Sequence, residues 1–372
     1  MRSYDVAIVG GGIVGCACAA EFSRAGLTTV LIEPDVIGGG ATAASMGHLA
    51  LMDDSEAQFA LCRYSQLLWQ ELSATLPPAC EYHAAGALWV AADQQEIAEV
   101  HRKAAFYASR GVPVQILDEL DLREAEPNLR HGLAGGLLLP QDAILYPPPA
   151  ALFLARAAQS FGAELLIGVC AIDISTSSVR LSNGTRIAAG TIVLANGTLV
   201  SQFAPEVSIR PRKGHLVITD RYPKFVRHQL IELGYLKNAH SSDADSVAFN
   251  AQPRATGQIL LGSSRQYGTE DPAIDARMLN RMLRRAIDYM PALREFSIIR
   301  TWTGFRASTP DNLPLIGPCP GRSNVYLAAG HEGLGITTSL GTARLLADII
   351  LGRASAIPHV PYAPERVYAL AH

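Results

Sequence analysis

The sequence predicts an α/β protein in which one domain is discontinuous and a second domain is inserted into it. Residues 4–33 read as a strand, a glycine-rich turn, a helix and a second strand. Further nucleotide-binding signals occur near residue 195 and near residue 335. The chain has 372 residues, more than the roughly 100–200 of a typical domain, so we expect two domains. We expect the nucleotide-binding domain at 1–80, 141–203 and 308–372, and the inserted domain at 81–140 and 204–307.

The composition supports large buried cores and excludes several partner classes. Hydrophobic residues make up 49% of the chain and charged residues 17%, which argues against disorder. The net charge of −3 is dispersed, so neither nucleic acid nor an anionic membrane is an expected partner. No apolar run approaches the ~18 residues of a membrane-spanning helix, and the first residues enter a strand rather than a signal peptide. We therefore expect a cytoplasmic protein.

The six cysteines match no disulfide framework, zinc site or iron–sulfur pattern. They are expected to be ordinary buried thiols, and no metal site is expected. Any iron–sulfur cluster that serves this protein would have to lie on another chain.

The individual elements follow from hydrophobic periodicity and turn residues. The N-terminal unit consists of the strand Tyr4–Val9, the small-residue helix Ile13–Ala25 and the strand Thr28–Glu33. A small-residue stretch, 38–45, follows and suits close approach of the backbone to a ligand. The next helices are expected at Ser55–Leu76, Gln94–Arg110 and Pro147–Phe161, and the strands at Ala87–Ala91, Gly136–Leu139 and Glu164–Ile167.

The second half of the chain is richer in strands. Short strands between 171 and 195 are broken by Asn183-Gly184, a typical hairpin turn. Further strands are expected at Leu216–Thr219, Ser246–Asn250, Gln258–Gly262 and Asn324–Ala328, and helices at Asp275–Leu293 and Thr337–Leu351.

The glycine turn Gly10-Gly11-Gly12-Ile13-Val14-Gly15 matches the pattern G-x-G-x-x-G. Gly10 permits the tight turn, Gly12 leaves room for a pyrophosphate, and Gly15 lets the helix pack closely. The N-terminus of the helix then offers free N–H groups and partial positive charge to phosphates. Glu33 ends the second strand, where its carboxylate can bind ribose hydroxyls and disfavours a 2′-phosphate.

This unit alone is compatible with NAD or FAD. An NAD domain would normally continue with further β-α units, whereas here small residues and long helices follow. A flavin needs contacts from distant parts of the chain, and the strand 191–197 and the helix start 330–337 supply candidates. A helix start beside the flavin pyrimidine would favour negative charge on the reduced ring. The expected further FAD contacts are Ala41, Thr42, Met46, Gly47, His48, Ala171, Gly197, His331, Glu332, Gly333, Leu334, Gly335, Ile336 and Thr337.

Motifs along essentially the whole chain resemble the D-amino-acid oxidase and glycine oxidase (DAO) family of FAD-dependent oxidoreductases. These motifs are YDVAIVGGGIVG, LIE, EPNL, GTIVLANG, PRKGHLV, TGFRASTPDNLPLIG and LAAGHEGLGITTSLGTARLLADIILG. Within the family, the stretches ATAASMGHLALMDDSEAQFALCRYSQ and GHEGLG look most like the β subunits of bacterial D-hydroxyproline dehydrogenases. Opine oxidase B subunits and the C subunit of hydrogen cyanide synthase look similar.

The resemblance implies a Rossmann-like FAD domain and an α+β substrate domain whose mixed sheet covers the flavin. It also implies oxidation of a C–N bond beside a carboxylate, with hydride transfer to the flavin. The family's arginine for the substrate carboxylate matches Arg306, and a planar guanidinium suits that partner. The alternative for Arg306 is a salt bridge between domains; Asp311 and Asn312 could supply it or could simply cap a turn. Sarcosine oxidases attach their flavin through a cysteine that aligns with Gly304, so the FAD is expected to be non-covalent.

Other positions leave alternatives open. Glycine oxidases carry an arginine and an asparagine in the turn that reads Glu332-Gly333-Leu334 here, so their second guanidinium contact is missing. His48 is expected to make a backbone contact near the cofactor, with tethering or proton transfer as the alternative. His331 is expected to bond the turn rather than act as a base. Tyr235 and Phe249 are candidates for the substrate pocket, although most aromatic residues in strands belong to the core.

The resemblance implies an FAD-dependent amino or imino acid dehydrogenase, with a D-hydroxyproline-like or D-proline-like substrate. Its electrons are expected to pass to a partner subunit that carries an iron–sulfur or second flavin centre, since no second cofactor motif occurs in this chain. The alternatives are a glycine-oxidising subunit of a hydrogen cyanide synthase, an opine oxidase, and a flavin-bearing assembly subunit without its own turnover.

Overall fold

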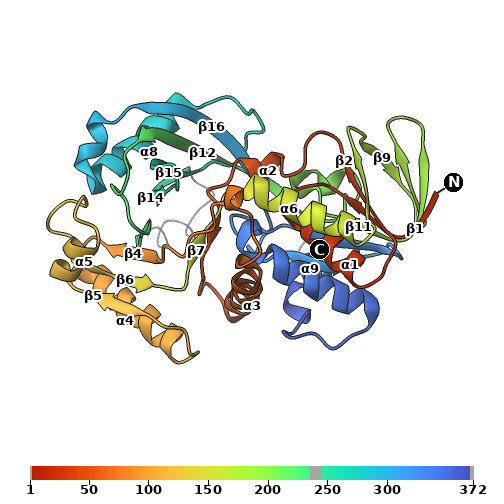
Figure 1. The fold of residues 1–372 in the computed structure, drawn as a ribbon, viewed down its shortest axis with the longest axis horizontal. Coiled ribbons are helices and arrows are strands. Elements are labelled where there is room, and N and C mark those ends of the chain that lie inside the picture. Colours follow the sequence, from red (N-terminus) through yellow and green to blue (C-terminus); the bar gives the residue numbers. More distant parts are fainter. Residues whose placement is uncertain (1, 235–244, 369–372) are drawn as a thin grey trace.

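The structure, a computed structural model, describes residues 2–234 and 245–368. Figure 1 shows two sheets side by side along the long axis, with helices packed around each. The helices are α1 (Ile13–Arg24), α2 (Gly40–Ala43), α3 (Glu56–Ser73), α4 (Gln94–Ala108), α5 (Glu119–Ala125), α6 (Pro147–Ser160), α8 (Ala276–Tyr289), α9 (Gly335–Leu351) and α10 (Glu365–Tyr368). Short 3-10 helices occupy Pro78–Cys80, Gly197–Gln202, Pro291–Glu295 and Val360–Tyr362.

The first sheet is eight-stranded, with the order β17-β18-β11-β1-β2-β8; β10 pairs with β11, and β9 with β10. The strands from β18 to β8 are parallel, and the pairs that involve β17, β10 and β9 are antiparallel. Helix α1 packs between α6 and α9 on one face of this sheet (Figure 1). Its strands are β1 (Arg2–Val9), β2 (Thr29–Glu33), β8 (Glu164–Ile167), β9 (Ala171–Ile174), β10 (Ser178–Leu181), β11 (Arg186–Leu194), β17 (Leu315–Pro318) and β18 (Val325–Ala329).

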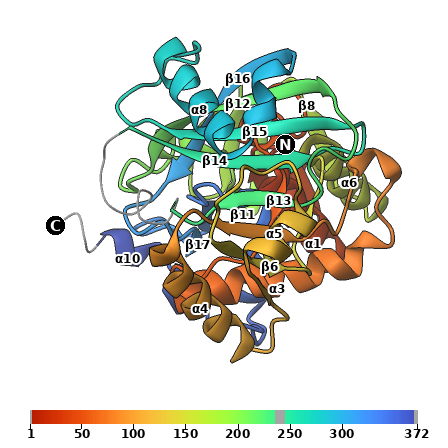
Figure 2. The same ribbon diagram turned by 90° about the vertical axis from the view of Figure 1, so that its left-hand side faces the viewer.

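The second sheet is also eight-stranded and mixed, with the order β16-β12-β15-β14-β13-β4-β6-β5. The pair β13 and β4 is parallel, and the other pairs are antiparallel. Helix α8 packs on β14 and β15 (Figure 2). The strands are β4 (Ala87–Ala91), β5 (Gln115–Leu117), β6 (Gly135–Leu139), β12 (Arg210–Arg221), β13 (Gln229–Glu232), β14 (Ser246–Pro253), β15 (Gln258–Arg265) and β16 (Ile298–Ser308). A third, two-stranded sheet pairs β3 (His48–Leu49) with β7 (Ala143–Ile144).

The predicted fold class, an α/β fold with a mixed second sheet, is confirmed. The strands of the first sheet come from residues 2–33, 164–194 and 315–329, and those of the second from 87–139 and 210–308. On this division of the strands we propose the domain boundaries given above.

Helices α3, α4 and α8 begin at side-chain caps that satisfy free amides of their first turns. The hydroxyl of Ser55 accepts from the amide of Gln58 at the start of α3. The carboxylates of Asp93 and Asp275 likewise accept from backbone amides in the first turns of α4 and α8, respectively. The sequence did not predict β16, although this strand carries Arg306.

Among residues 2–234 and 245–368, no helix combines the length and the apolar character needed to cross a membrane. The same residues contain no group of three or more His, Cys, Asp or Glu side chains that could hold a metal ion. All six cysteines are unpaired, and five of them are buried.

Candidate functional site: an elongated cavity between the two sheets

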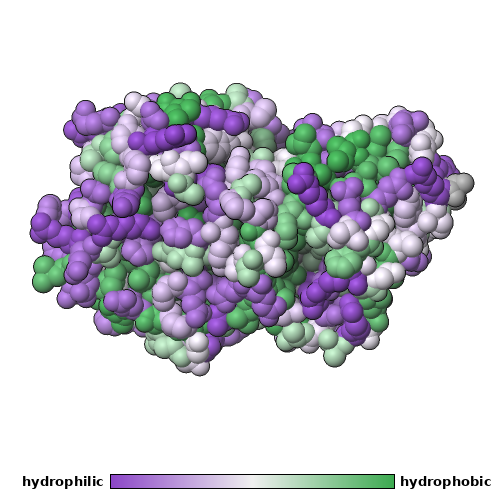
Figure 3. Space-filling view, viewed as in Figure 1, coloured by the Kyte–Doolittle hydropathy of each residue, from purple (hydrophilic) through white to green (hydrophobic). Residues whose placement is uncertain are grey.

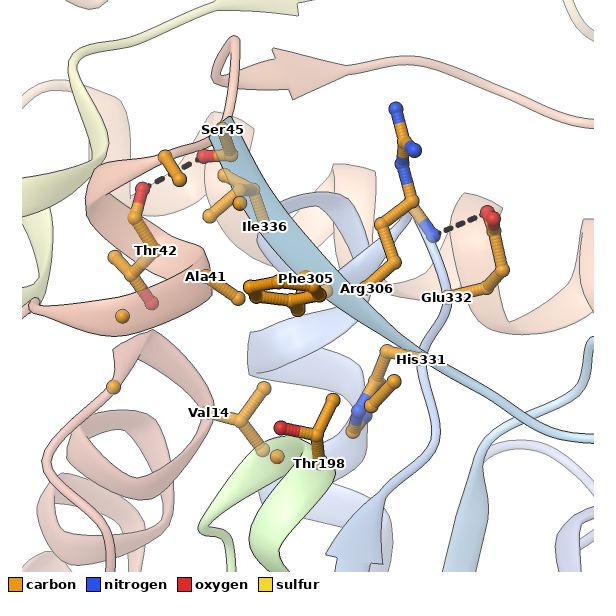
Figure 4. Close-up of a pocket in the computed structure, with 18 of the residues that line it drawn as sticks. Val14, Ala41, Thr42, Ser45, Thr198, Phe305, Arg306, His331, Glu332 and Ile336 are labelled. Carbon is orange, nitrogen blue, oxygen red and sulfur yellow. Dashed lines mark hydrogen bonds between the residues drawn. The ribbon is translucent and has the colours of Figure 1, made fainter. Parts of the chain in front are cut away.

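A cavity of about 690 Å³ runs from the glycine turn of the first sheet to the strands of the second. Figure 4 shows Val14 and Thr198 at one side, Phe305 in the middle, and Arg306 with Glu332 at another side. We call the part lined by the first sheet the nucleotide end, and the part lined by the strands of the second sheet (β4, β12, β13, β14, β15 and β16) the substrate end. Figure 3 shows one face of the molecule, on which polar and apolar residues are intermixed over the part built on the second sheet, on the left.

The glycines at the nucleotide end are required by close backbone contacts. Gly10 has a φ of +110°, and a Cβ there would lie 2.6 Å from the carbonyl oxygen of Ala195. A Cβ on Gly15 would lie 1.9 Å from the carbonyl oxygen of Gly10, so this glycine lets α1 pack on the turn. A Cβ on Gly12 would lie 3.2 Å from Oγ1 of Thr42. The turn therefore brings bare backbone to the wall of the cavity.

Helix α1 points its N-terminus at the cavity, where its first amides are available. The N-cap residue, Gly12, has no side chain that could accept from these amides. The amide of Ile13 donates to Oγ1 of Thr42, at 3.0 Å. The carboxylate of Glu33 accepts from the amides of Gly11, at 2.7 Å, and Asp35, at 2.9 Å. These two bonds fix the carboxylate at the end of β2, beside the turn, where a ribose would lie.

Two histidines line the middle of the cavity and are held neutral by burial. Burial lowers the pKa of His48 to about 4, and it lowers the pKa of His331 to about 4. His331, in the turn before α9, bonds Oγ1 of Thr342 within that helix through Nε2, at 3.0 Å. The backbone carbonyl of His48 accepts from Oγ1 of Thr337, at 2.9 Å, and its Nε2 has no hydrogen-bond partner among the described residues.

Arg306 lies at the substrate end. Its Nη1 donates to the carbonyl oxygen of Ser264, at 3.0 Å, and its guanidinium covers Gly214, where a Cβ would lie 2.7 Å from Nη1. Asp311 does not hold it, because that carboxylate pairs with Arg366 at 2.7 Å and accepts from the amide of Leu313. The alternative of a salt bridge from Arg306 to Asp311 is therefore wrong.

Glu332 joins the two sheets beside Arg306. Its carboxylate lies 2.8 Å from Nη1 of Arg212 and 4.0 Å from Nε of Arg265. Burial alone would raise the pKa of Glu332, but the guanidinium groups of Arg265, Arg306 and Arg212 outweigh it and lower the pKa to about 2. Glu332 is therefore ionised at neutral pH. Sequence reasoning missed Arg212 and Arg265, and only the family motif PRKGHLV pointed at Arg212.

Most residues predicted to bind the cofactor are brought together along this cavity. They are Gly10, Gly12, Ile13, Val14, Glu33, Ala41, Thr42, Met46, Gly47, His48, Ala171, Gly197, His331, Glu332, Gly333, Leu334, Gly335 and Ile336. Gly15 and Thr337 do not line it, since Gly15 packs against the turn and Thr337 against β3.

Phe249 requires a correction. It is fully buried in the core of the second sheet, where its ring stacks on Tyr289 with a centroid distance of 4.6 Å, and it does not line the cavity. Successive side chains of a strand point to opposite faces, so the cavity receives its neighbour Asn250 instead. Tyr235, the other aromatic candidate, lies outside the described residues.

The cavity fits FAD. It joins the N-terminus of α1 and the carboxylate of Glu33 to the compartment lined by the second sheet. Two enclosed polar atoms on its wall, Oδ1 of Asn196 and Nε2 of His48, have no partner among the described residues and suit a polar cofactor. FAD bound there would accept a hydride, that is, two electrons, from a substrate at the other end.

Comparisons with known proteins agree with this fit. The chain is 29% identical over 378 residues to glycine oxidase of Geobacillus kaustophilus, covering 98% of this chain and 97% of the relative. It is 26% identical to hydrogen cyanide synthase subunit HcnC of Pseudomonas aeruginosa, covering 98% and 96%. The crystal structure of the Geobacillus kaustophilus glycine oxidase superposes with a TM-score of 0.87, at 27% identity and 98% coverage of both chains.

The family model DAO, described as FAD dependent oxidoreductase, matches residues 5–349. The chain therefore belongs to the DAO family of FAD-dependent oxidoreductases, and FAD is its cofactor.

Proposed function

We propose that this protein oxidises the C–N bond of a D-amino or D-imino acid, with D-proline or D-hydroxyproline as the type of substrate. The observation that carries the proposal is the guanidinium of Arg306, which the Ser264 carbonyl holds at the substrate end of the FAD cavity. A guanidinium binds a carboxylate through two parallel hydrogen bonds and stays charged at every relevant pH. It would anchor the substrate carboxylate and thereby place the neighbouring α-carbon within the cavity.

The remaining wall of the substrate end favours a substrate that has an apolar side chain or ring over glycine. The apolar side chains of Leu216, Ile231 and Trp89 line the cavity there, together with Asn250 and Ser263. An apolar wall stabilises a hydrocarbon ring by about 25 cal/mol per Å² of surface removed from water. Glycine has no side chain with which to use this wall.

The amine of the substrate must be neutral when the hydride leaves the α-carbon. Glu332, with a pKa of about 2, is a poor proton acceptor at neutral pH, and it already binds Arg212. We therefore propose that Glu332 does not remove the amine proton and that the substrate binds with its amine neutral. The guanidinium groups at this end favour that form, because they oppose a second positive charge.

The test is an anaerobic panel of substrates that monitors reduction of the bound flavin through the loss of absorbance near ~450 nm. The panel contains D-proline, cis-4-hydroxy-D-proline, L-proline, glycine, sarcosine and opines. Fast bleaching by the D-imino acids and slow bleaching by glycine is the expected result. Bleaching by glycine alone would instead support the alternative of a glycine-oxidising subunit, for which glycine oxidase and HcnC are the relevant relatives.

We further propose that the electrons pass to a partner subunit with an iron–sulfur or second flavin centre. HcnC is by its name a subunit of a synthase, which supports an assembly of this kind. The isolated chain with substrate is then expected to form hydrogen peroxide slowly and to reduce an artificial dye quickly. Rapid peroxide formation would overturn this part of the proposal, and failure of every substrate to bleach the flavin would favour an assembly subunit without turnover.

A further inference from the structure

Arg306 is held by a buried group of residues that lies behind the cavity. Its Nη1 donates to the backbone carbonyl of Ser264, and the side chain of Ser264 is in turn bonded by His215 on β12. His215 and Ser264 are both fully buried. The position of the guanidinium therefore depends on where this serine is held.

The strand pairing explains why a side chain is needed at this point. The ladder between β12 and β15 pairs Val217 with Leu261, and an isolated bridge pairs Lys213 with Gln266. Three residues, 214–216, lie between these pairs on β12, and four, 262–265, lie between them on β15. The extra residue on β15 makes a β-bulge, a feature that is common beside active sites. Within the bulge the amide of His215 donates to Oγ of Ser264, at 2.9 Å, rather than to a backbone carbonyl.

The hydrogen bonds assign the tautomer of His215. The amide of Asp275 donates to its Nε2, at 3.0 Å, so Nε2 accepts and the ring proton lies on Nδ1. Nδ1 lies 2.8 Å from Oγ of Ser264 and donates to it. Asp275 is itself fixed, because its carboxylate caps α8 and accepts from Nε2 of Gln266.

We infer that His215 is a positioning residue for the carboxylate anchor: its Nδ1–H holds Ser264, and the Ser264 carbonyl holds the guanidinium of Arg306. The inference rests on the proposed function, in which Arg306 binds the substrate carboxylate. Burial, followed by the charges of Lys213 and Arg306, lowers the pKa of His215, against the opposing effect of Asp275. The ring is therefore neutral at pH 7, as this pattern of donors and acceptors requires.

Two substitutions test the hydrogen bonds of the two ring nitrogens of His215 separately. In His215→Asn the amide nitrogen lies near the position of Nδ1 and keeps a donor for Ser264, but the contact with Asp275 is lost. In His215→Gln the amide oxygen lies near the position of Nε2 and keeps an acceptor for Asp275, but the donor to Ser264 is lost. Ser264→Ala removes the shared hydroxyl and leaves the backbone carbonyl in place. His228→Gln, remote from the cavity, is the control.

The measurement is the Kd of pyrrole-2-carboxylate, a planar analogue of proline, from the change it causes in the flavin spectrum of the FAD-loaded protein. The KM and kcat for D-proline are measured alongside. We expect His215→Gln and Ser264→Ala to raise Kd and KM about 5-fold or more, as loss of one buried hydrogen bond predicts. His215→Asn is expected to stay near the wild-type values, and kcat is expected to change less than KM in all three variants.

Arg306→Lys serves as the reference that separates the two claims. If it leaves Kd unchanged while FAD stays bound, the proposed function fails, and the inference fails with it. If Arg306→Lys raises Kd but His215→Asn and His215→Gln behave alike, only the inference is overturned. The inference is also overturned if Ser264→Ala binds pyrrole-2-carboxylate as tightly as the wild type does.

Discussion

Nη1 of Arg212 lies 2.8 Å from Oε1 of Glu332, and this ion pair connects the second sheet to the turn before α9. Both side chains are nearly enclosed, with exposed fractions of 8% and 10%. Removing one member of a buried pair leaves the other charge without compensation, which typically costs about 3–5 kcal/mol. The contact therefore couples the flavin side of the cavity to its substrate side.

Glu332→Gln is accordingly expected to lower the free energy of unfolding by about 3 kcal/mol, because Arg212 loses its counter-charge. Arg212→Met is expected to have a comparable cost, and the double variant a smaller cost than the sum of the two. The check is thermal unfolding of the FAD-loaded variants, followed by the release of flavin fluorescence. Additive effects would show that the two residues act independently.

The glycine turn yields a prediction about cofactor retention. Gly10→Ala would place a Cβ 2.6 Å from a backbone oxygen that cannot move aside, and the turn would have to open. We expect at least a tenfold loss of FAD affinity, read from the ratio of absorbance near ~450 nm to that at ~280 nm after gel filtration.

Gly162→Ala is the matched control for this variant, because Gly162 also has a positive φ, of +94°, but faces open space. It is expected to cost about 1 kcal/mol of stability from backbone strain and to retain its FAD. Equal loss of FAD in both variants would mean that backbone strain at a positive φ, rather than the contact with Ala195, governs FAD retention.

Gly214 yields a prediction about Arg306. A Cβ at this position would lie 2.7 Å from Nη1, so Gly214→Ala must displace the guanidinium. We expect the KM for an amino or imino acid to rise about tenfold, with FAD content and the peak position of the flavin spectrum unchanged. An unchanged KM would show that the guanidinium can shift without loss of substrate binding.

The two histidines of the cavity wall, His48 and His331, predict how stability falls at acid pH. Each has a pKa near 4 in the folded protein, below the ordinary value of 6.5, so the unfolded chain binds more protons between these values. Stability is therefore complete above about pH 6.5 and falls as the pH falls toward about 4, by of the order of 3 kcal/mol per histidine. Urea unfolding at a series of pH values tests this, and His331→Asn should reduce the slope. A flat stability between pH 7 and pH 5 would contradict it.

The nucleotide end could be predicted because its signals are local. The spacing of Gly10, Gly12 and Gly15 and the acid at Glu33 lie within one continuous unit, and each has a single steric or electrostatic reason. The same holds for α3, whose predicted start is its cap Ser55, and for α4, whose predicted start, Gln94, directly follows its cap Asp93.

The substrate end could be predicted only in part, because its residues meet through strand pairing. Arg212 lies directly opposite Arg306 in the register of β12 and β16, and Arg265 comes from the neighbouring strand. No local pattern marks that register. The face of β14 on which Phe249 lies could not be predicted for a similar reason. A shift by one position along the strand moves a side chain from the core face to the cavity face.

The role of Arg306 as the substrate anchor is tested most directly by anaerobic rapid mixing with D-proline, which measures the rate of flavin reduction against substrate concentration. Arg300, an exposed arginine of the same strand that does not line the cavity, provides the control. We predict saturation at similar concentrations for the wild type and Arg300→Ala, and an apparent Kd raised about 30-fold or more for Arg306→Ala with FAD still bound. Saturation of Arg306→Ala at wild-type concentrations of D-proline would contradict this role.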